Sequence, residues 1–312
     1  MSAYNNVNTA FRSGGIIPVD LGVNDAVLRA IGHSGSTFWV DSNTGSNGND
    51  GLSPASPVAT IDYAVGLCTA NKGDVIFVMP GHAENISAAT SLVVDVAGVS
   101  IFGLGNGSNR PTLTYTATAG SIEMDAANTR LSNVRLVAGI ASVVVAINVD
   151  ADNVEIDHCE LTISATGLEF LLMVDVDAFD NANIHDNRFL AENIAGTNTG
   201  IRLDDTIGVQ IHNNQFRGDF TTGAISGTAG SAAASVDAAV FDNVIENRDT
   251  TAGVLLDHHD NTTGITFRNT GFSLFATNIT GSFDTGNTLC AQNYVVNAID
   301  ETAAVSPTTA ST

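Results

Sequence analysis

The chain of 312 residues is long enough for one large domain or two ordinary ones, and its hydrophobic content of 44% excludes a chain that is disordered as a whole. It carries 33 acidic residues against 11 basic ones, a net charge of −22, and Lys72 is its single lysine. Such a surface repels phosphate groups, which disfavours direct binding to nucleic acids and anionic membranes. It suits salty water, where cations screen the repulsion, and so hints at a marine setting.

The first part of the chain, residues 1–36, shows no repeat and is predicted to form an N-terminal arm. Its opening, MSAYNNVNTAFRSGG, lacks the basic and then apolar pattern of a signal peptide, and no apolar run of the chain could span a membrane. We therefore expect synthesis in a cytoplasm, where the protein folds or from which it leaves by lysis or by a route that the sequence does not show. The cysteines Cys68, Cys159 and Cys290 lie far apart and are interpreted as core residues, not as a disulfide framework or a metal site.

Residues 37–74 are predicted to lead into the repeats and to hold a capping helix. The stretch SPASPVATIDYAVGLCTANKGD places four apolar residues on one face of a helix over residues 57–70: Val58, Ile61, Val65 and Cys68. We expect this helix to plug the N-terminal end of the domain that follows, because a repeat protein with open ends must cap them.

An internal repeat runs through residues 75–285. Six phrases such as LVVDVAGVSI and INVDADNVEI join two apolar pieces by a short turn that begins with aspartate, and the first five aspartates are separated by 30, 25, 27 and 27 residues. The aspartates are Asp95, Asp125, Asp150, Asp177, Asp204 and Asp257.

The second apolar piece repeats at matching positions. Its first apolar residues are Leu131, Ile156, Ile184, Ile211, Val240 and Phe267. Five residues later come Leu136, Leu161, Phe189, Phe216, Ile245 and Phe272. Each unit alternates apolar and polar residues with a period of two, which predicts strands rather than the helices of other repeats of this size.

These units predict a right-handed parallel β-helix, that is, an all-β solenoid built from a single chain. Propeller blades need about 40 residues or more, which is longer than the spacing here. Columns such as Ile156–Ile184–Ile211 should then stack inside, one residue per coil, at about the 4.8 Å distance between paired strands. Residues 286–312 do not fit the pattern and are predicted to form a C-terminal cap and tail, so that both ends carry extended arms.

The chain also resembles the pectate-lyase-like right-handed parallel β-helix superfamily, in particular its phage structural proteins, decoration proteins or tailspikes. The resemblance lies in FWVDSNTGSNGNDGLSPASPVATI, and its residues are Trp39, Val40, Asp41, Gly51, Leu52, Ser53, Pro54, Pro57, Thr60 and Ile61. It implies the fold and, for the phage members, assembly as a homotrimer. It does not imply an activity, because this fold hosts many unrelated functions.

Two carboxylate pairs are the candidates for catalysis. Asp175 and Asp177 lie two apart on a strand, so both should point to one face about 6.5–7 Å apart, a separation that glycosidases use. Asp204 and Asp205 are adjacent and should diverge. The chain lacks the Gly-His-Gly and Arg-x-Lys elements of polygalacturonase-like members and no arginine set like that of pectate lyases could be assembled, so we expect a solvated face and assign no catalytic residue.

The repeated aspartates allow two interpretations. Each could accept backbone N–H groups of its own turn, which we favour, or hard cations could sit between the stacked carboxylates. The DHHD stretch at 257–260 is interpreted as a polar turn, because His258 and His259 should point opposite ways on a strand. The loop at 41–51 partly matches a calcium loop but has Leu52 where glutamate should follow, and is interpreted as a turn. No metal or cofactor is expected.

The sequence therefore favours a structural virion protein, most simply a capsid decoration protein on the surface of a phage particle. Its partners would be copies of itself and a major capsid or tail protein. A tailspike-type polysaccharide hydrolase or lyase is the alternative, and a carbohydrate-binding tail protein is another. A single tryptophan, Trp39, and four tyrosines argue against a long sugar-binding groove of either kind.

Overall fold

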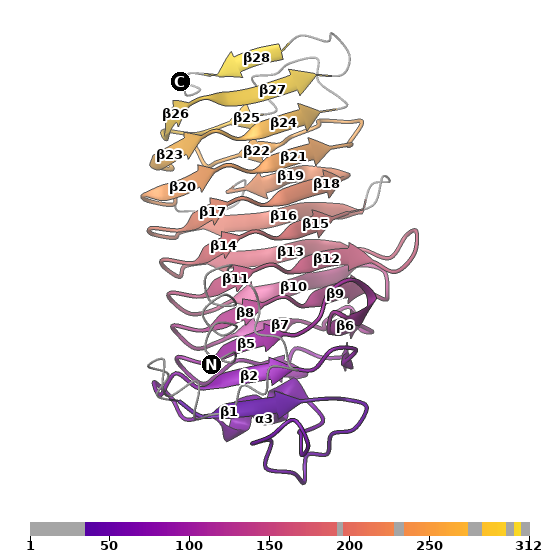
Figure 1. The fold of residues 1–312 in the computed structure, drawn as a ribbon. Helices are drawn as coiled ribbons and strands as arrows, with labels where there is room; N and C mark the ends of the chain where they lie inside the picture. Colours follow the sequence, from indigo (N-terminus) through magenta and orange to yellow (C-terminus); the bar gives the residue numbers. More distant parts are fainter. Residues whose placement is uncertain (1–34, 192–195, 228–233, 274–282, 298–302, 307–312) are drawn as a thin grey trace, which may run out of the picture.

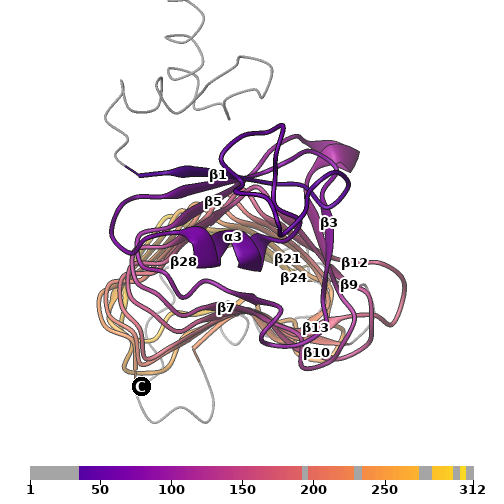
Figure 2. The ribbon, with the colours of Figure 1, turned by 90° about the horizontal axis from the view of Figure 1, so that it is seen from below.

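The computed structural model describes residues 35–191, 196–227, 234–273, 283–297 and 303–306, and these form a parallel β-solenoid. Each complete coil contributes one strand to each of three sheets, and equivalent strands of successive coils pair in parallel (Figure 1). Seen along the axis, the three sheets enclose the interior (Figure 2). The prediction of an all-β solenoid is confirmed.

Sheet A has ten strands: β1 (Thr37–Val40), β2 (Val75–Val78), β5 (Ser100–Gly103), β8 (Arg130–Ser132), β11 (Glu155–Asp157), β14 (Asn183–His185), β17 (Gln210–His212), β20 (Ala238–Phe241), β23 (Gly264–Phe267) and β26 (Leu289–Ala291). Sheet B follows after a sharp corner: β3 (Ala83–Ile86), β6 (Thr112–Tyr115), β9 (Arg135–Ala138), β12 (Glu160–Ile163), β15 (Arg188–Leu190), β18 (Gln215–Gly218), β21 (Val244–Asn247), β24 (Thr270–Ser273), β27 (Asn293–Asn297) and β28 (Ala303–Ser306). Sheet C has eight strands: β4 (Leu92–Val93), β7 (Ile122–Met124), β10 (Val143–Val149), β13 (Phe170–Asp177), β16 (Thr197–Asp204), β19 (Phe220–Ser226), β22 (Leu256–Asp257) and β25 (Phe283–Asp284).

The core consists of apolar columns that run along the solenoid. Ile156 pairs in register with Ile184, and Ile184 with Ile211, and all three are fully buried as predicted. In sheet B the rings of Phe189 and Phe216 stack with centroids 4.6 Å apart. Burial of each such side chain stabilises the fold by roughly 1.5–3 kcal/mol, which makes these columns the main source of stability.

The predicted columns are wrong by one residue in the last coils. Val240 pairs with Thr266, not with Phe267, and Ile245 pairs with Gly271, not with Phe272. Because side chains alternate between faces, this shift turns Phe267 and Phe272 outward. Asp257 shifts likewise, since it pairs with Ser226 and Asp284 and so lies outside the column of the other five aspartates.

A column of buried asparagines lines the corner between sheets A and B. The Oδ1 of Asn187 accepts the backbone N–H of Cys159 at 2.8 Å, and the Oδ1 of each later asparagine accepts the backbone N–H of the preceding one at 3.0–3.1 Å. Each Nδ2 donates to a sheet A carbonyl at 2.8–2.9 Å. The corner backbone, which has no neighbouring strand of its own, is thereby satisfied. The column consists of Asn187, Asn214, Asn243, Asn269 and Asn293.

The turn between sheets C and A takes a left-handed backbone conformation in several successive coils. Asn128, Asn153 and Asn181 occupy it with φ of 58–60°, and Gly208 takes the same place in the next coil with φ of 71°. Asparagine and glycine tolerate this conformation, which explains the Asn- and Asp-rich turns of the repeat.

Helix α3 (Ile61–Leu67) is shorter than the predicted helix over residues 57–70. It begins at Thr60, whose side chain accepts the N–H of Tyr63 at 3.4 Å. Ile61, Ala64 and Val65 are buried in the same core as the strands, and α3 lies across the interior in the view along the axis (Figure 2). The short 3₁₀ helix η2 (Gly107–Asn109) lies on a loop. In the described part of the chain, no helix is long and apolar enough to cross a membrane.

The parallel ladder is longer than the predicted range 75–285. It starts at β1, which pairs with β2, and continues through β26 and β27. Strand β28 then pairs antiparallel with β27 and ends sheet B. The predicted N-terminal arm, except for Gly35 and Ser36, lies outside the described residues, as do residues 298–302 and 307–312 of the predicted tail.

The three cysteines are free thiols. Cys159 is buried and belongs to the core, as predicted, whereas Cys68 is half-buried and packs against it and Cys290 is half-buried. Burial raises the pKa of Cys159 to about 12, so it stays a protonated thiol.

Candidate functional site

The outward face of sheet C gathers the candidate carboxylates in two neighbouring columns. In the first, Asn148 pairs with both Glu123 and Asp175, and Asp175 pairs with Arg202. The second column lies two residues further along each strand and holds Asp95, Asp125, Asp150, Asp177 and Asp204. The inward Val174 and Val176 are fully buried, which forces Asp175 and Asp177 outward.

Asp175 is already held by an arginine. Arg202, on the next coil, donates from Nε and Nη2 to the two carboxylate oxygens of Asp175 at 2.6 Å each and lies 3.7 Å from Asp177. Asp175 is 6% exposed, and burial raises its pKa although Arg202 opposes the shift. The predicted pair therefore shares one face, but both carboxylate oxygens of Asp175 are already bound by the guanidinium of Arg202.

The second predicted pair separates, as expected for adjacent residues. Asp204 lies beside Asp177 in the aspartate column, whereas Asp205 begins the turn with φ of 50° and is exposed. These two carboxylates do not form a site together.

The stacked aspartates repel one another. Burial and then the neighbouring carboxylates raise the pKa of Asp125, Asp150 and Asp204 above the usual value. The favoured interpretation, acceptance of backbone N–H groups, does not describe Asp150, whose Oδ2 accepts from the side chain of Asn148 at 2.6 Å. Oxygen atoms of Glu123, Asp125 and Asp150 lie within 4.8 Å of one another, which suits a hard cation such as Ca²⁺.

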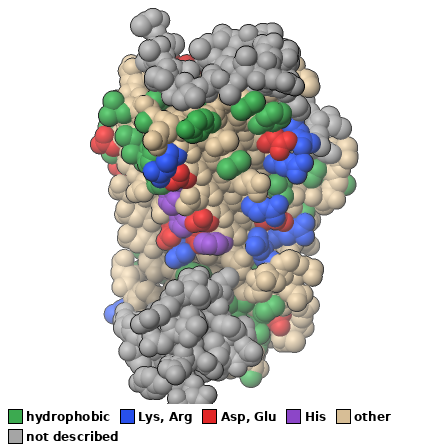
Figure 3. Space-filling view, turned by 45° about the horizontal axis from the view of Figure 1, so that its top comes forward, with side chains coloured by type: hydrophobic (Ala, Val, Ile, Leu, Met, Phe, Trp, Pro, Cys, Tyr) green, Lys and Arg blue, Asp and Glu red, His purple; other side chains and the backbone are tan. Residues whose placement is uncertain are grey.

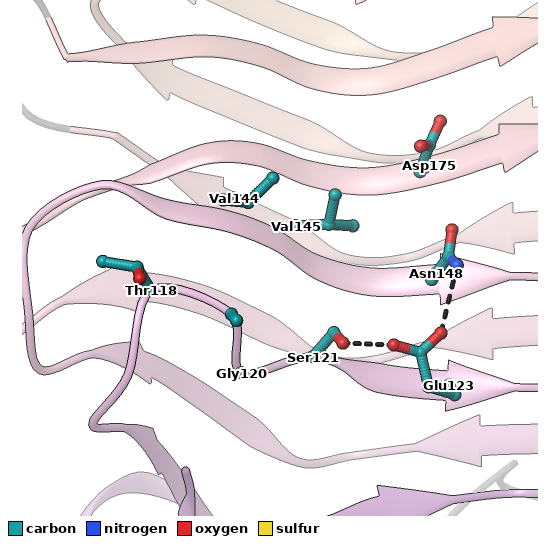
Figure 4. Close-up of a pocket in the computed structure, with 9 residues that line it drawn as sticks. Thr118, Gly120, Ser121, Glu123, Val144, Val145, Asn148 and Asp175 are labelled. Atoms are coloured by element: carbon teal, nitrogen blue, oxygen red, sulfur yellow. Dashed lines mark hydrogen bonds between the residues drawn. The ribbon is translucent and has the colours of Figure 1, made fainter. Parts of the chain in front are cut away.

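A shallow groove of about 320 Å³ runs beside these carboxylates (Figure 4). Its walls come from β7 and the loop before it and from β10 and β13, and its polar side chains include Glu123, Asn148 and Asp175. Ser121 donates to Glu123, and the amide of Asn148 donates to the other oxygen of Glu123 at 3.0 Å. Glu123 is a residue of this face that the sequence analysis missed.

A second polar cluster, also missed, lies on the outward face of sheet A. Arg130 donates from Nε and Nη2 to both oxygens of Asp157 at 2.8 Å, and Ser132 donates to the same carboxylate at 2.9 Å. Burial alone would raise the pKa of Asp157, but Arg130, then His158 and Ser132, lower it, so this fully buried carboxylate is ionised. Glu155, Asp157 and His185 could together hold a metal ion, but Arg130 supplies the compensating charge.

Four rings continue this face towards the C-terminus. His185, His212, Phe241 and Phe267 stack with centroid distances of 4.7–4.9 Å. Burial alone would lower the pKa of His185, but its hydrogen bonds to the carboxylates of Asp186 and Glu155 raise it. Burial and the neighbouring His185 lower the pKa of His212. The recurrence of His or Phe at one offset, as in IHDNRF, IHNNQF and VFDNVI, is the sequence feature that could have predicted this stack.

The DHHD stretch is a turn that forms no metal site among the described residues. His258 is 2% exposed, its side chain points into the core, and burial lowers its pKa to about 4. Its neighbour Asp257 faces outward. The loop at 41–51 is likewise a turn, in which Asp41 accepts from Asn43 N–H at 3.0 Å and from Thr44 at 2.6 Å.

Comparisons with known proteins add weak similarities of structure. No family model and no curated protein matches this sequence. A rhamnogalacturonan lyase aligns over 88% of this chain and 90% of its own with 12% identity and a TM-score of 0.41. A GH136 lacto-N-biosidase from Eubacterium ramulus aligns over 83% of this chain and 67% of its own with 12% identity and a TM-score of 0.28. The parallel solenoid itself is established by the strand pairing of this chain.

Proposed function

We propose that this protein is a structural component of a phage particle, most simply a capsid decoration protein that acts as a rigid rod on the particle surface. It would assemble with copies of itself and with a major capsid or tail protein. This proposal rests on the sequence resemblance and on one observation of the structure, the Asp175–Arg202 pair.

The pair matters because a catalytic carboxylate must be free to reach its substrate. Asp175 is buried and doubly bound by Arg202, and Asp204 and Asp205 diverge, so neither predicted pair is available to act as acid and base. The buried columns and the asparagine column instead favour rigidity, which is what a surface component needs.

Imaging of intact particles that carry this protein, with labelled antibodies against it, tests the proposal. Regular copies over the shell are expected for a decoration protein, and a few copies at the tail would indicate a receptor-binding or polysaccharide-degrading role. Purified particles without the protein would contradict the proposal.

The alternative, a polysaccharide hydrolase, is favoured by one observation, the groove on sheet C. Asp125 and Asp150 stand close to it with raised pKa values, and such values suit a general acid. Release of reducing sugar from acidic and neutral polysaccharides by the purified protein, abolished in Asp150→Asn, would establish this activity and replace the structural proposal.

We further propose that α3 closes the N-terminal end of a right-handed solenoid. Its buried residues Ile61 and Val65 share the core of the first coils, and Glu84 accepts the N–H of Ile61 at 3.1 Å. Ile61→Asp should expose the end and cause aggregation, whereas Tyr63→Asp, at a 38% exposed position of the same helix, should not.

A further inference from the structure

The outward face of sheet B carries positive charge, although the chain as a whole is strongly acidic. Strands β9, β12, β15, β18 and β21 hold Arg135, Arg188 and Arg217 against Glu160 and Glu246, and Arg248 follows β21 directly. Asp219 directly follows β18, so four arginines against three acids leave an excess of one positive charge. Figure 3 shows Lys and Arg side chains gathered down the right side of the view, where sheet B lies.

The arginines outnumber their partners on this face. Glu160 lies 3.2 Å from Arg135 and 2.7 Å from Arg188, because the two arginines flank it on the neighbouring coils. Glu246 likewise lies 3.3 Å from Arg217 and 2.6 Å from Arg248. The side chains of Arg188 and Arg217 remain 53% and 55% exposed, so they can contact a further anion.

The outward face of sheet C has the opposite charge. Strands β7, β10, β13 and β16 and the residues that directly follow them carry seven acids against Arg202, a net charge of −6. The acids are Glu123, Asp125, Asp150, Asp175, Asp177, Asp204 and Asp205. Like charges on adjacent strands repel, and the face therefore favours a cationic partner.

The two charged faces lie at the same height along the solenoid. Within one coil β9 leads into β10, and Arg135 belongs to the same coil as Asp150. Two coils further on, β15 leads into β16, and Arg188 belongs to the same coil as Asp204. Two parallel copies placed side by side without an axial shift would therefore bring arginines opposite aspartates.

We propose that sheet B of one copy docks against sheet C of a second copy, with Arg135 and Arg188 facing the Asp150–Asp204 column. Because the contact joins two different faces, each copy can bind two others. Without an axial shift, such repeated contacts close into a ring rather than extend as a filament. The charges set the partner face of the contact, because the arginines of sheet B then lie opposite aspartates of sheet C. This inference deepens the proposed structural role, since it names the faces through which copies assemble.

Sedimentation velocity of the full chain tests this docking. The wild type should form a discrete oligomer in about 0.05 M NaCl, and dissociate in about 1 M NaCl, where charges are screened beyond about 3 Å. Arg188→Glu and Asp204→Arg should each weaken association at least about tenfold, and the double variant Arg188→Glu/Asp204→Arg should restore it. Thermal melting of each variant verifies that it is folded.

The matched control is Arg268→Glu, which makes the same charge change at the corner of sheets A and B, where Arg268 pairs with Asp242. It should leave association unchanged. A monomeric wild type, or equal loss in Arg188→Glu and Arg268→Glu, or no restoration in the double variant, would overturn the docking. These results do not depend on where the protein lies on the particle, which is the test of the structural role. The docking proposal and the structural proposal can therefore fail separately.

Discussion

Asp257 and Asp284 are directly paired in the parallel register of β22 and β25, so two carboxylates share one outward position on adjacent coils. Burial, then Asp284 and Asp260, raise the pKa of Asp257 to about 6. The native state therefore disfavours the ionised form, and stability is lost as the pH rises from the ordinary value of 3.8 through about 6.

Asp257→Asn should remove this repulsion. Because Asp257 is only half-buried, we expect a gain of about 1–2 kcal/mol at neutral pH in the free energy of unfolding, and no gain below about pH 4, where the wild-type carboxyl is protonated. Urea unfolding at several pH values measures it. Asp152→Asn, at an exposed turn, serves as the control, and a gain that persists in acid would contradict the explanation.

His258 should act in the opposite direction. Burial lowers its pKa to about 4, so the unfolded chain binds a proton below the ordinary value of 6.5 while the native state does not. The free energy of unfolding therefore has its full value above about pH 6.5 and falls by up to about 3 kcal/mol as the pH drops to 4. In His258→Leu this acid-dependent loss should disappear, and the same unfolding experiment detects it. An unchanged pH profile would mean that His258 is protonated in the native state.

Asn243 lies in the middle of the asparagine column. Its Nδ2 donates to the carbonyl of Ile211 at 2.9 Å, and its Oδ1 accepts the N–H of Asn214 at 3.0 Å. Asn243→Ala leaves these buried groups without partners and should cost about 3 kcal/mol in unfolding free energy. Asn198→Ala, at an exposed position, should cost less than about 0.5 kcal/mol. Equal losses in the two variants would refute a special role for the column.

The Asp175–Arg202 pair allows a double-mutant cycle. Arg202→Gln leaves a buried carboxylate without its cation and should destabilise the fold by about 2 kcal/mol, reduced from the cost of a fully buried pair because the arginine is 40% exposed. Asp175→Asn/Arg202→Gln should recover most of this loss. Thermal or urea unfolding of the wild type, Asp175→Asn, Arg202→Gln and the double variant gives the coupling energy between the two side chains. Additive effects of the two substitutions would show that the pair does not stabilise the fold.

The fold was predictable because each coil repeats the same inward residues. Ile156, Ile184 and Ile211 carry a strong period of two, and this period predicts their shared column. In the last coils the inward residues are Thr266 and Gly271, which carry no hydrophobic pattern. The hydrophobic pattern instead places the large Phe267 and Phe272 in the inward columns. Both lie one residue further along the chain than the true inward residues, so their side chains point outward.

The candidate site was predictable only in part. The spacing of Asp175 and Asp177 on one strand predicts their shared face. The partner of Asp175, Arg202, lies 27 residues away, and its contact depends on the register between two coils, which the sequence alone does not define. The asparagine column was missed for a related reason, because asparagine is also common in exposed turns and its burial here depends on the corner geometry.

The antiparallel strand β28 has a consequence for the length of the rod. A parallel ladder that ended at β27 would leave an unpaired edge, onto which another chain could add its own strands. By turning back on this edge, β28 occupies the hydrogen-bonding groups of β27. The edge of sheet B is therefore β28, which runs opposite to the other strands, so the parallel ladder cannot simply continue onto the first strands of a second copy as in an amyloid-like fibre.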